Sequence, residues 1–294
     1  MTTKMRGRDV AQDIRATAKA KVLELHEDNI YPKLAIVRVG RDKGSIGYQN
    51  AAQKIMQQVE IDVEIHEYAA DIAMSDFEKE FSELNERSDI HGILLLRPLP
   101  QQLDTEKIQR AVDPHKDIDG MNPINLGKSL DPQLDDFVPL TPAAVLAMLD
   151  YYEIPLQGKK VTIIGHSLVV GRPLANMMMA RNATVAVCNE YTPDNKEYTR
   201  DADFVVTAVG KIGLLKYDMV KTGAIVVDVG TNYDSQGKVT GDVMYAQVAP
   251  KTSYINPVPG GVGSITTSLL AQRVVQAAEH FHKITSTGSS VEEP

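Results

Sequence analysis

The sequence predicts an α/β protein built from two domains. Its 294 residues are many for one hydrophobic core and suit two domains of ordinary size. Short apolar runs typical of strands alternate with segments of helical spacing in both halves of the chain. Two loops rich in glycine and proline, at 165–173 and 257–263, stand beside expected helix starts. These observations favour an N-terminal α/β domain followed by a Rossmann-like, doubly wound domain.

The first half of the chain alternates between helical and extended segments. Residues 9–28 carry apolar side chains at helical spacing, whereas 63–68 alternate as a strand does. Residues 92–96 are apolar after the glycine, as expected for a strand covered on both faces. Ser45 and Ser75 are expected to cap the helices that follow them. The predicted elements are helices at 9–28, 46–59 and 75–87, and strands at 34–39, 63–68 and 92–96.

The second half restarts the same alternation after a connecting helix. Thr141 is the expected N-cap of that helix, Pro142 its first residue, and Tyr151 lies near its end. Apolar runs then recur at the intervals typical of a doubly wound sheet. The predicted elements are strands at 160–164, 184–187, 204–208 and 224–227, with helices at 173–181 and 266–283.

These elements divide the chain into two predicted domains and a tail. We expect residues 1–140, completed by the C-terminal helix at 266–283, to form the first domain. The second, Rossmann-like domain should span 141–265. The polar segment at 284–294 is expected to be disordered.

Composition excludes several classes of protein. The formal charge of −8 and the pI near 5.4 argue against nucleic-acid or anionic-membrane partners. The single cysteine, Cys188, excludes an internal disulfide and lies in an apolar run where burial is expected. The N-terminus lacks the apolar core of a signal peptide, and the histidines show no metal-ligand spacing. We therefore expect a soluble, cytoplasmic protein without a metal site.

Two loops carry the candidate chemistry. Gly165 follows a buried strand and Pro173 opens a helix, so the backbone between them can hold a phosphate at the helix N-terminus. The spacing Gly-x-Ser-x-x-x-Gly differs from the generic dinucleotide fingerprint. In the second loop, Pro259, Gly260 and Gly261 fix the backbone beside another helix start and suit a polar ligand. A plain connecting loop is the alternative interpretation of that segment.

Several motifs together resemble the methylenetetrahydrofolate dehydrogenase/methenyltetrahydrofolate cyclohydrolase family. The similarity covers about residues 6–282, and the motifs keep their order and spacing. The resemblance implies oxidation of 5,10-methylenetetrahydrofolate to 5,10-methenyltetrahydrofolate with NAD(P) in one-carbon metabolism, and a homodimer. The matching segments lie at 91–94, 98–100, 116–120, 158–159, 165–173, 183–185, 223–230 and 257–263.

The resemblance also assigns roles to individual residues. It implies a tetrahydrofolate cleft between a catalytic first domain and a nucleotide-binding second domain. Asp119 would bind the pterin ring, and Tyr48 would pack on the aminobenzoate ring. Leu96, Arg97, Pro259, Gly260 and Gly261 would line the substrate site. Gly165, His166, Ser167, Gly171, Glu190 and Thr231 would hold the cofactor.

Two departures from the family pattern favour NAD over NADP. His166 replaces an arginine, and Glu190 stands where NADP-dependent members have a serine. A carboxylate after the second strand hydrogen-bonds a free ribose 2′-hydroxyl and repels a 2′-phosphate. The alternative is that Glu190 turns into solvent while a protonated His166 still accepts the phosphate.

Two further departures concern the cyclohydrolase step. Ala52 replaces the family's lysine one helical turn after Tyr48, and Leu96 replaces a glutamine. Lys54, a candidate substitute, lies roughly 240° around an ideal helix from Tyr48. Arg97 is either a replacement cation or a surface charge. Hydrolysis needs a group that transfers protons, whereas hydride transfer needs mainly orientation.

We therefore expect a dehydrogenase with weak or absent cyclohydrolase activity, with Tyr48, Lys54 and Asp119 as candidate catalytic residues. A fully bifunctional, NADP-dependent enzyme, with Lys54 or Arg97 as substitute, is the nearest alternative. A catalytically silent folate- and nucleotide-binding protein is a second alternative. A nicotinamide dehydrogenase for another small substrate is a third.

Overall fold

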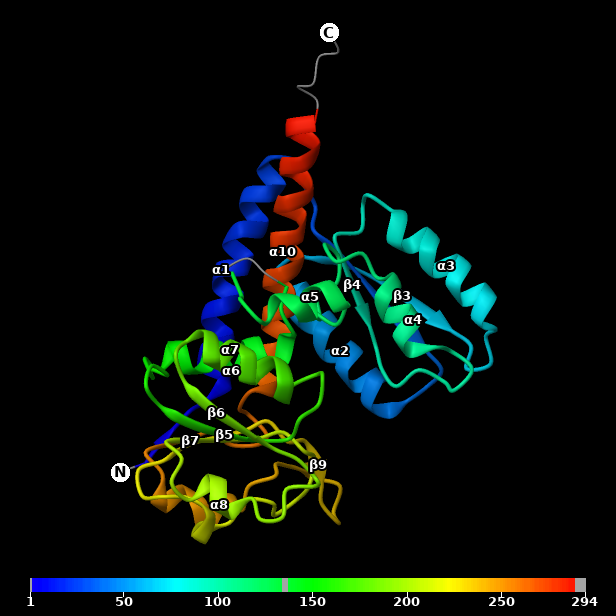
Figure 1. Ribbon diagram of the computed structural model, residues 1–294. Coiled ribbons are helices and arrows are strands. Elements are labelled where there is room, and N and C mark those ends of the chain that lie inside the picture. Colours follow the sequence, from blue (N-terminus) through cyan, green and yellow to red (C-terminus); the bar gives the residue numbers. More distant parts are fainter. Residues whose placement is uncertain (1, 134–136, 289–294) are drawn as a thin grey trace. The chain divides into compact units, whose positions relative to one another are not determined.

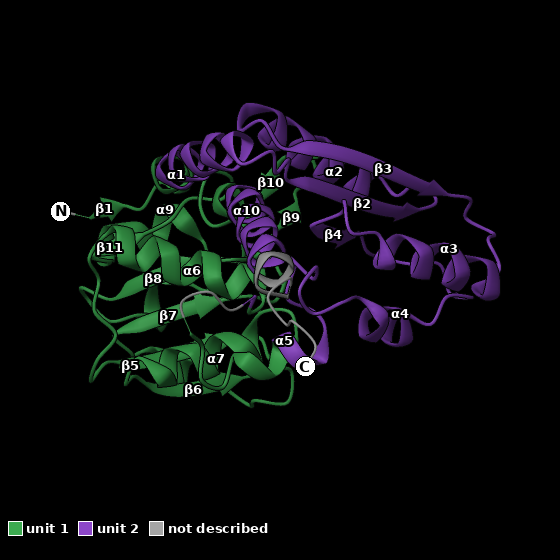
Figure 2. Cartoon of the chain, turned by 90° about the horizontal axis from the view of Figure 1, so that it is seen from above, with its two compact units in different colours: residues 1–11, 126–134, 138–266 green, residues 12–125, 135–137, 267–294 purple. Residues whose placement is uncertain are grey.

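The chain folds around two parallel β-sheets, one in each of two units (Figure 1). The structure is a computed structural model that describes residues 2–133 and 137–288, with side chains up to residue 283. Unit 1 contains Met1–Ala11, Leu126–Leu134 and Val138–Thr266 (Figure 2). Unit 2 contains Gln12–Asn125, Asp135–Phe137 and Thr267–Pro294. Compared with the predicted domain ranges, unit 1 also includes the first eleven residues and the segment from Leu126.

Unit 1 contains a six-stranded parallel sheet in the order β1-β11-β8-β7-β5-β6. The chain runs from β5 to β6 on one side and then crosses to β7 on the other, which creates a switch point at the carboxyl edge. The strands are β1 (Thr3–Lys4), β5 (Lys160–Ile164), β6 (Thr184–Cys188), β7 (Phe204–Thr207), β8 (Ile225–Asp228) and β11 (Tyr254–Ile255), with a separate hairpin of β9 (Asn232–Tyr233) and β10 (Val239–Thr240).

Both faces of this sheet are covered, which explains why its strands are apolar runs. Helices α6 and α7 pack together, and α7 contacts β5 and β6. On the other face, Leu215, Val220, Val243 and Val248 join one apolar cluster with strand residues such as Val205. The helices are α6 (Leu140–Tyr151), α7 (Gly171–Ala180), α8 (Lys196–Thr199) and α9 (Tyr245–Val248), with short 3₁₀ turns η1 (Tyr217–Met219) and η2 (Ala249–Lys251).

Unit 2 contains a three-stranded parallel sheet in the order β3-β2-β4. Side chains alternate between its faces, so Ala35 and Val37 join a cluster with Phe77 of α3 and Ile108 of α4. The strands are β2 (Lys33–Val39), β3 (Asp62–Tyr68) and β4 (Gly92–Leu95). The helices are α1 (Gly7–Glu27), α2 (Lys43–Gln58), α3 (Met74–Glu86), α4 (Thr105–Ala111), α5 (Pro123–Lys128) and α10 (Gly263–Gly288). Of these helices, α1, α5 and α10 begin or end in unit 1.

Helices α1 and α10 run side by side in unit 2 (Figure 1), where Arg15 Nη1 donates to Ser268 Oγ at 3.0 Å. The helix α10 also packs closely on β4. A Cβ at Gly92 would stand 2.9 Å from Ile118 Cγ2 and 3.1 Å from Val274 Cγ2. The absence of a side chain at Gly92 therefore lets α10 approach the strand.

Helices α2, α3 and α6 begin earlier than the sequence predicted, and their predicted caps are wrong. Asp42, not Ser45, is the N-cap of α2, and its Oδ1 accepts a hydrogen bond from the Ser45 backbone at 2.8 Å. The predicted capping box at Ser75 is wrong, because α3 begins at Met74 and its N-cap makes no side-chain hydrogen bond. Thr141 likewise lies inside α6. Asp and Ser are both good caps, so composition alone did not identify the first residue.

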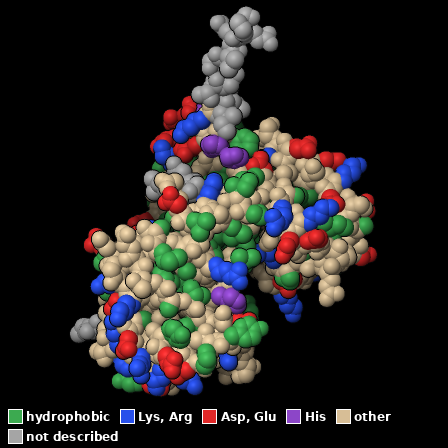
Figure 3. Space-filling model, in the orientation of Figure 1, with side chains coloured by type: hydrophobic (Ala, Val, Ile, Leu, Met, Phe, Trp, Pro, Cys, Tyr) green, Lys and Arg blue, Asp and Glu red, His purple; other side chains and the backbone are tan. Residues whose placement is uncertain are grey.

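The last helix extends past both predicted ends, since no proline interrupts Gly263–Gly288. Residues 284–288, predicted as part of a disordered tail, have helical backbone. The rest of that tail, 289–294, lies outside the described residues. Among the described residues, no helix combines the length and apolar character needed to cross a bilayer. Acidic and basic side chains are intermixed on the face drawn in Figure 3.

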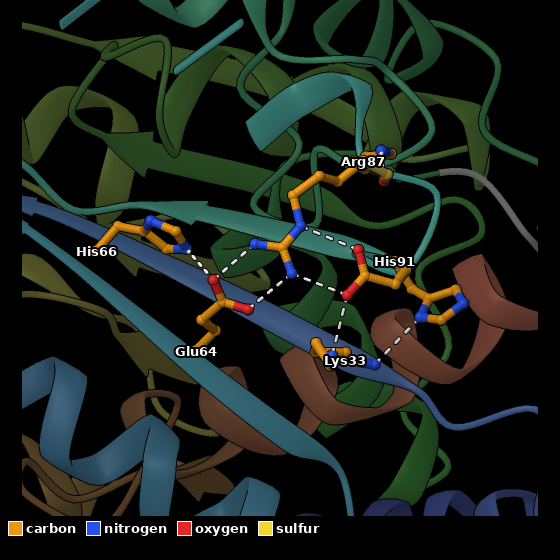
Figure 4. Close-up of polar contacts among 7 residues, drawn as sticks. Lys33, Glu64, His66, Arg87 and His91 are labelled. Carbon is orange, nitrogen blue, oxygen red and sulfur yellow. Dashed lines mark hydrogen bonds and ion pairs between the residues drawn. The ribbon is translucent and has the colours of Figure 1, made fainter. Parts of the chain in front are cut away.

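Charged residues at the start of the unit 2 strands form a network around Arg87 (Figure 4). The Arg87 guanidinium donates to both carboxylate oxygens of Glu64, at 2.7 and 2.9 Å, and to Asp89. Lys33 also pairs with Asp89, at 3.0 Å. Hydrogen bonds from Arg87 and Lys33 hold the pKa of the Asp89 carboxyl well below its usual range. The His91 imidazole accepts from the Lys33 backbone at 3.1 Å.

Candidate active site

The glycine loop of unit 1 lies at the switch point of the sheet. Gly165 follows β5 and has φ +119°, a conformation that favours glycine. A Cβ there would overlap the carbonyl oxygen of Ala208, which follows β7. A Cβ at Gly171, the first residue of α7, would overlap the carbonyl oxygen of Gly165. Both glycines are therefore required by close backbone approach.

The loop between these glycines is closed by local hydrogen bonds. Ser167 Oγ accepts from the Val170 backbone at 3.1 Å, and the Ser167 carbonyl accepts from the Arg172 backbone at 3.1 Å. The loop thus leads into the N-terminus of the ten-residue helix α7, and its backbone is not covered by side chains at the two glycines. Such a glycine cradle at a helix start and a sheet switch point fits the pyrophosphate of a nicotinamide dinucleotide.

His166 and Glu190 face each other beside this loop. His166 Nδ1 lies 3.6 Å from Glu190 Oε2, and the two side chains are 36% and 63% exposed. Glu190 stands just after β6, where a cofactor ribose is expected in this type of sheet. Cys188, the last residue of β6, is buried as predicted, and burial raises the pKa of its thiol.

Two buried aspartates, which were not among the predicted site residues, hold the carboxyl edge of the unit 1 sheet. Asp228 ends β8 and accepts from the Asp242 and Val243 backbones at 3.1 and 3.0 Å. Burial raises the pKa of the Asp228 carboxyl. Asp242 binds the loop after β7 and the segment after Thr231, accepting from the backbones of Val209 (2.9 Å), Gly210 (3.2 Å) and Lys211 (2.7 Å) and from Asn232 Nδ2 (2.9 Å).

These contacts fix the loops on either side of Thr231, which is itself exposed. The sequence contains a signal for these two aspartates, namely the glycines that pack against their carboxylates. A Cβ at Gly230 would overlap the Asp242 carboxylate, and one at Gly241 would overlap that of Asp228.

The loop at 257–263 is also tightly specified. A Cβ at Gly261 would overlap the Asn256 amide, and Gly260 has φ +97°. Asn256 bridges this loop to β8, accepting from the Asp228 backbone at 2.7 Å and donating to its carbonyl at 2.8 Å. Pro259 and Gly260 are exposed, whereas Gly261 is buried. Of the three predicted contact residues in this loop, Pro259 and Gly260 are therefore accessible to a ligand.

The predicted folate residues of unit 2 are distributed unequally around helix α2. Tyr48 is half-buried and Ala52 is fully buried, one turn apart. Lys54 is exposed. Since α2 is continuous from Lys43 to Gln58, Lys54 lies roughly 200° around the axis from Ala52. The structure therefore places Lys54 away from the position at which a substitute lysine was expected.

Arg97 and Asp119 are brought together in unit 2. Arg97 Nη2 lies 3.1 Å from Asp119 Oδ2, and the side chains are 28% and 24% exposed. Ser45 Oγ donates to the Arg97 carbonyl at 3.0 Å, which ties this residue to the start of α2. Arg97 therefore pairs with the carboxylate that is predicted to bind pterin, and its role as a replacement cation stays a prediction. Leu96 beside it is buried.

The other charged residues of the segment 116–120 are buried. Lys116 Nζ donates to the carbonyls of Asn85 and Arg87, at 2.7 and 2.6 Å. Asp117 accepts from the Asn122 backbone at 2.6 Å, and burial raises the pKa of its carboxyl. Asp119 is the acidic residue of this segment with appreciable exposure. A cavity of about 10 Å³ lies beside it, enough for about one water molecule.

Comparisons with known proteins agree with this geometry. Residues 5–119 match the catalytic domain of the tetrahydrofolate dehydrogenase/cyclohydrolase family, and 139–282 match its NAD(P)-binding domain. The bifunctional protein FolD of Alkaliphilus metalliredigens is 43% identical over 280 residues, covering 95% of this chain and 99% of the relative.

Solved structures give the same result. The bifunctional enzyme FolD of Campylobacter jejuni has a TM-score of 0.93 and 38% identity, covering 95% of this chain and 99% of that one. The Trypanosoma brucei FolD, solved with NADP and an inhibitor, has a TM-score of 0.89 and 30% identity, covering 95% and 98%. The two-domain α/β fold and the matched domains confirm the predicted fold class. This chain therefore belongs to the tetrahydrofolate dehydrogenase/cyclohydrolase family.

Proposed function

We propose that this protein is a 5,10-methylenetetrahydrofolate dehydrogenase that uses NAD(P). The observation that carries the proposal is the glycine cradle at the switch point, within a chain that matches both family domains. When bound, the nicotinamide accepts the hydride that leaves the methylene carbon. The protein's own task is to bind and orient the two reactants and to exclude water.

For the nucleotide, we assign Gly165, Ser167 and Gly171 to the phosphates and Thr231 to the carboxyl edge where ligands lie. His166 and Glu190 would contact the adenosine ribose. An exposed carboxylate beside an imidazole, with no arginine at position 166 to attract a 2′-phosphate, suits a ribose bearing a free 2′-hydroxyl, so we propose NAD as the preferred cofactor. The NADP bound in the trypanosomal relative favours the opposite preference.

For the folate, we assign Asp119 to the aminopterin edge and Tyr48 to the aminobenzoate ring. A carboxylate can accept two parallel N–H bonds from such an edge. Arg97, paired with Asp119, would hold that carboxylate in place. Leu96, Pro259, Gly260 and Gly261 stay predicted folate contacts. Lys54 is not included, since its side chain is exposed on another part of helix α2.

We further propose that the cyclohydrolase activity is weak. The support is chemical, because Ala52 and Leu96 offer no group that could transfer a proton to or from water at the methenyl carbon. The relatives at 43% and 38% identity are bifunctional enzymes, which favours the second activity. The two possibilities differ in a measurable product.

A spectrophotometric time course separates these possibilities. Purified protein is mixed with methylenetetrahydrofolate and either NAD or NADP, and the reduced nicotinamide and methenyl product are followed separately. We expect reduction with NAD and accumulation of the methenyl product. Reduction with NADP alone would refute the cofactor preference, and methenyl that vanishes as it forms would establish the bifunctional enzyme. Binding without turnover would identify a silent binding protein.

We also propose a homodimer from the family resemblance. Sedimentation equilibrium over a range of protein concentrations tests this assembly, and a monomer at all of them would refute it.

A further inference from the structure

A buried arginine in helix α10 has no role in the mechanism described so far. Arg273 is 5% exposed, and burial lowers the pKa of its guanidinium to about 10, so it stays charged at neutral pH. Its Nη1 donates to the Ile118 carbonyl at 2.8 Å. A buried charge is costly unless it is paired and hydrogen-bonded. The groups around Arg273 therefore explain why it is tolerated.

Three acidic groups interact electrostatically with Arg273: Asp119, Asp117 and Tyr48. Asp117 already accepts from Asn122 and Asn125, so its carboxylate serves the turn that follows. Asp119 and Tyr48 are the two residues that we assign to the folate. The buried cation thus interacts electrostatically with both proposed folate-binding groups.

The backbone geometry makes this placement specific. Ile118, whose carbonyl binds Arg273, is the residue directly before Asp119. Gly92 lets Val274 of α10 and Ile118 approach β4 closely, which fixes the neighbouring position 273. On the accessible side, Arg97 pairs with the Asp119 carboxylate. Two guanidinium groups therefore restrain Asp119, one through its carboxylate and one through the preceding peptide.

We propose that Arg273 is a positioning residue for folate recognition, which holds Asp119 oriented for the aminopterin edge of the substrate. This inference rests on the proposed function. Arg273 acts through Asp119 and the Ile118 carbonyl and does not itself contact the reacting carbon.

The test compares Arg273→Met, which keeps length but removes charge, with Arg273→Lys, which keeps charge but loses the planar fork. Arg110→Met, at an exposed arginine of α4 in the same unit, is the matched control. Steady-state constants for methylenetetrahydrofolate and NAD are measured from pH 5 to 9, and tetrahydrofolate affinity is measured by calorimetry.

We expect Arg273→Met to raise the KM for methylenetetrahydrofolate about tenfold while the KM for NAD changes less than twofold. The kcat should change less than the KM for methylenetetrahydrofolate, because Arg273 does not itself contact the reacting carbon. Arg273→Lys should restore only part of the folate affinity, and Arg110→Met should change neither the folate KM nor kcat.

A folded Arg273→Met protein with an unchanged folate KM would overturn the inference. If Arg273→Met does not fold, Arg273→Lys decides: a wild-type folate KM overturns the inference, and a raised one with normal NAD kinetics supports it. A wild-type chain that neither binds nor oxidises methylenetetrahydrofolate overturns the proposed function, and this inference with it.

Discussion

The exchange Glu190→Ser should shift cofactor preference from NAD towards NADP. Glu190 stands after β6 beside His166, at the position where we expect the cofactor's ribose. Removing the carboxylate removes repulsion of a 2′-phosphate and leaves a hydroxyl that can donate to it. The dehydrogenase should therefore accept NADP more readily while its folate kinetics stay unchanged.

The size of the shift follows from the exposure of Glu190. Two unit charges about 4 Å apart interact by about 1 kcal/mol in bulk water and about 4 kcal/mol at an effective dielectric constant of about 20. Since the Glu190 side chain is 63% exposed, we take a value towards the lower end, about 1–2 kcal/mol. That corresponds to a factor of roughly 5–30 in kcat/KM for NADP.

The assay measures initial rates with NAD and NADP at saturating methylenetetrahydrofolate, at low and high ionic strength. Glu190→Gln is the matched control, because it removes the charge while keeping the size. The effect of both exchanges should shrink as salt screens the carboxylate. A ratio of NADP to NAD efficiency that stays within twofold of wild type in Glu190→Ser would refute the reasoning.

Three further exchanges test other parts of the structure. Asp242→Asn should destabilise the protein by about 2 kcal/mol in urea unfolding and raise the KM for NAD, because an amide cannot accept from all the N–H donors that the carboxylate binds. Gly171→Ala should lower the free energy of unfolding by at least about 3 kcal/mol, since the new Cβ would overlap the Gly165 carbonyl. A variant with the wild-type Tm would contradict this. Arg87→Ala should lower the free energy of unfolding by about 1 kcal/mol at pH 7; the value is small because the ion pairs of Arg87 are partly exposed to solvent. Because the pKa of Asp89 is lowered in the folded state, this contribution to stability is present above a pH of about 4 and is lost as the pH falls further. The free energies of unfolding of the wild type and Arg87→Ala should therefore differ less at pH 3 than at pH 7.

The sequence was a good guide to the central strands and a poor guide to the edges. Strands such as β5 and β7 are predictable because burial on both faces requires apolar side chains throughout. The strands β1 and β11 pair residues far apart in sequence, Lys4 with Ile255, and have two residues each. No local pattern of that length distinguishes a strand from a loop, so long-range pairing alone defines them.

The candidate site was partly predictable for similar reasons. The glycine loop could be read because close backbone approach permits no side chain at Gly165 or Gly171. Arg97 had two equal interpretations, since the sequence does not show whether its side chain meets Asp119. Arg273 was missed because it stands among the apolar residues of α10, where a single charged residue is ordinarily assigned to the exposed face.

The chemistry of arginine bears on whether this site can also hydrolyse the methenyl product. Arg97 and Arg273 supply positive charge near Asp119. A lysine can lose its proton when its surroundings lower the pKa, whereas a guanidinium stays protonated at neutral pH. Even Arg273, whose pKa is lowered to about 10, remains a cation there. Arginine can therefore replace the charge of the lysine in binding folate but not its capacity to transfer a proton to or from water. For this reason we expect oxidation to survive the change at Ala52 and hydrolysis to be weak or absent.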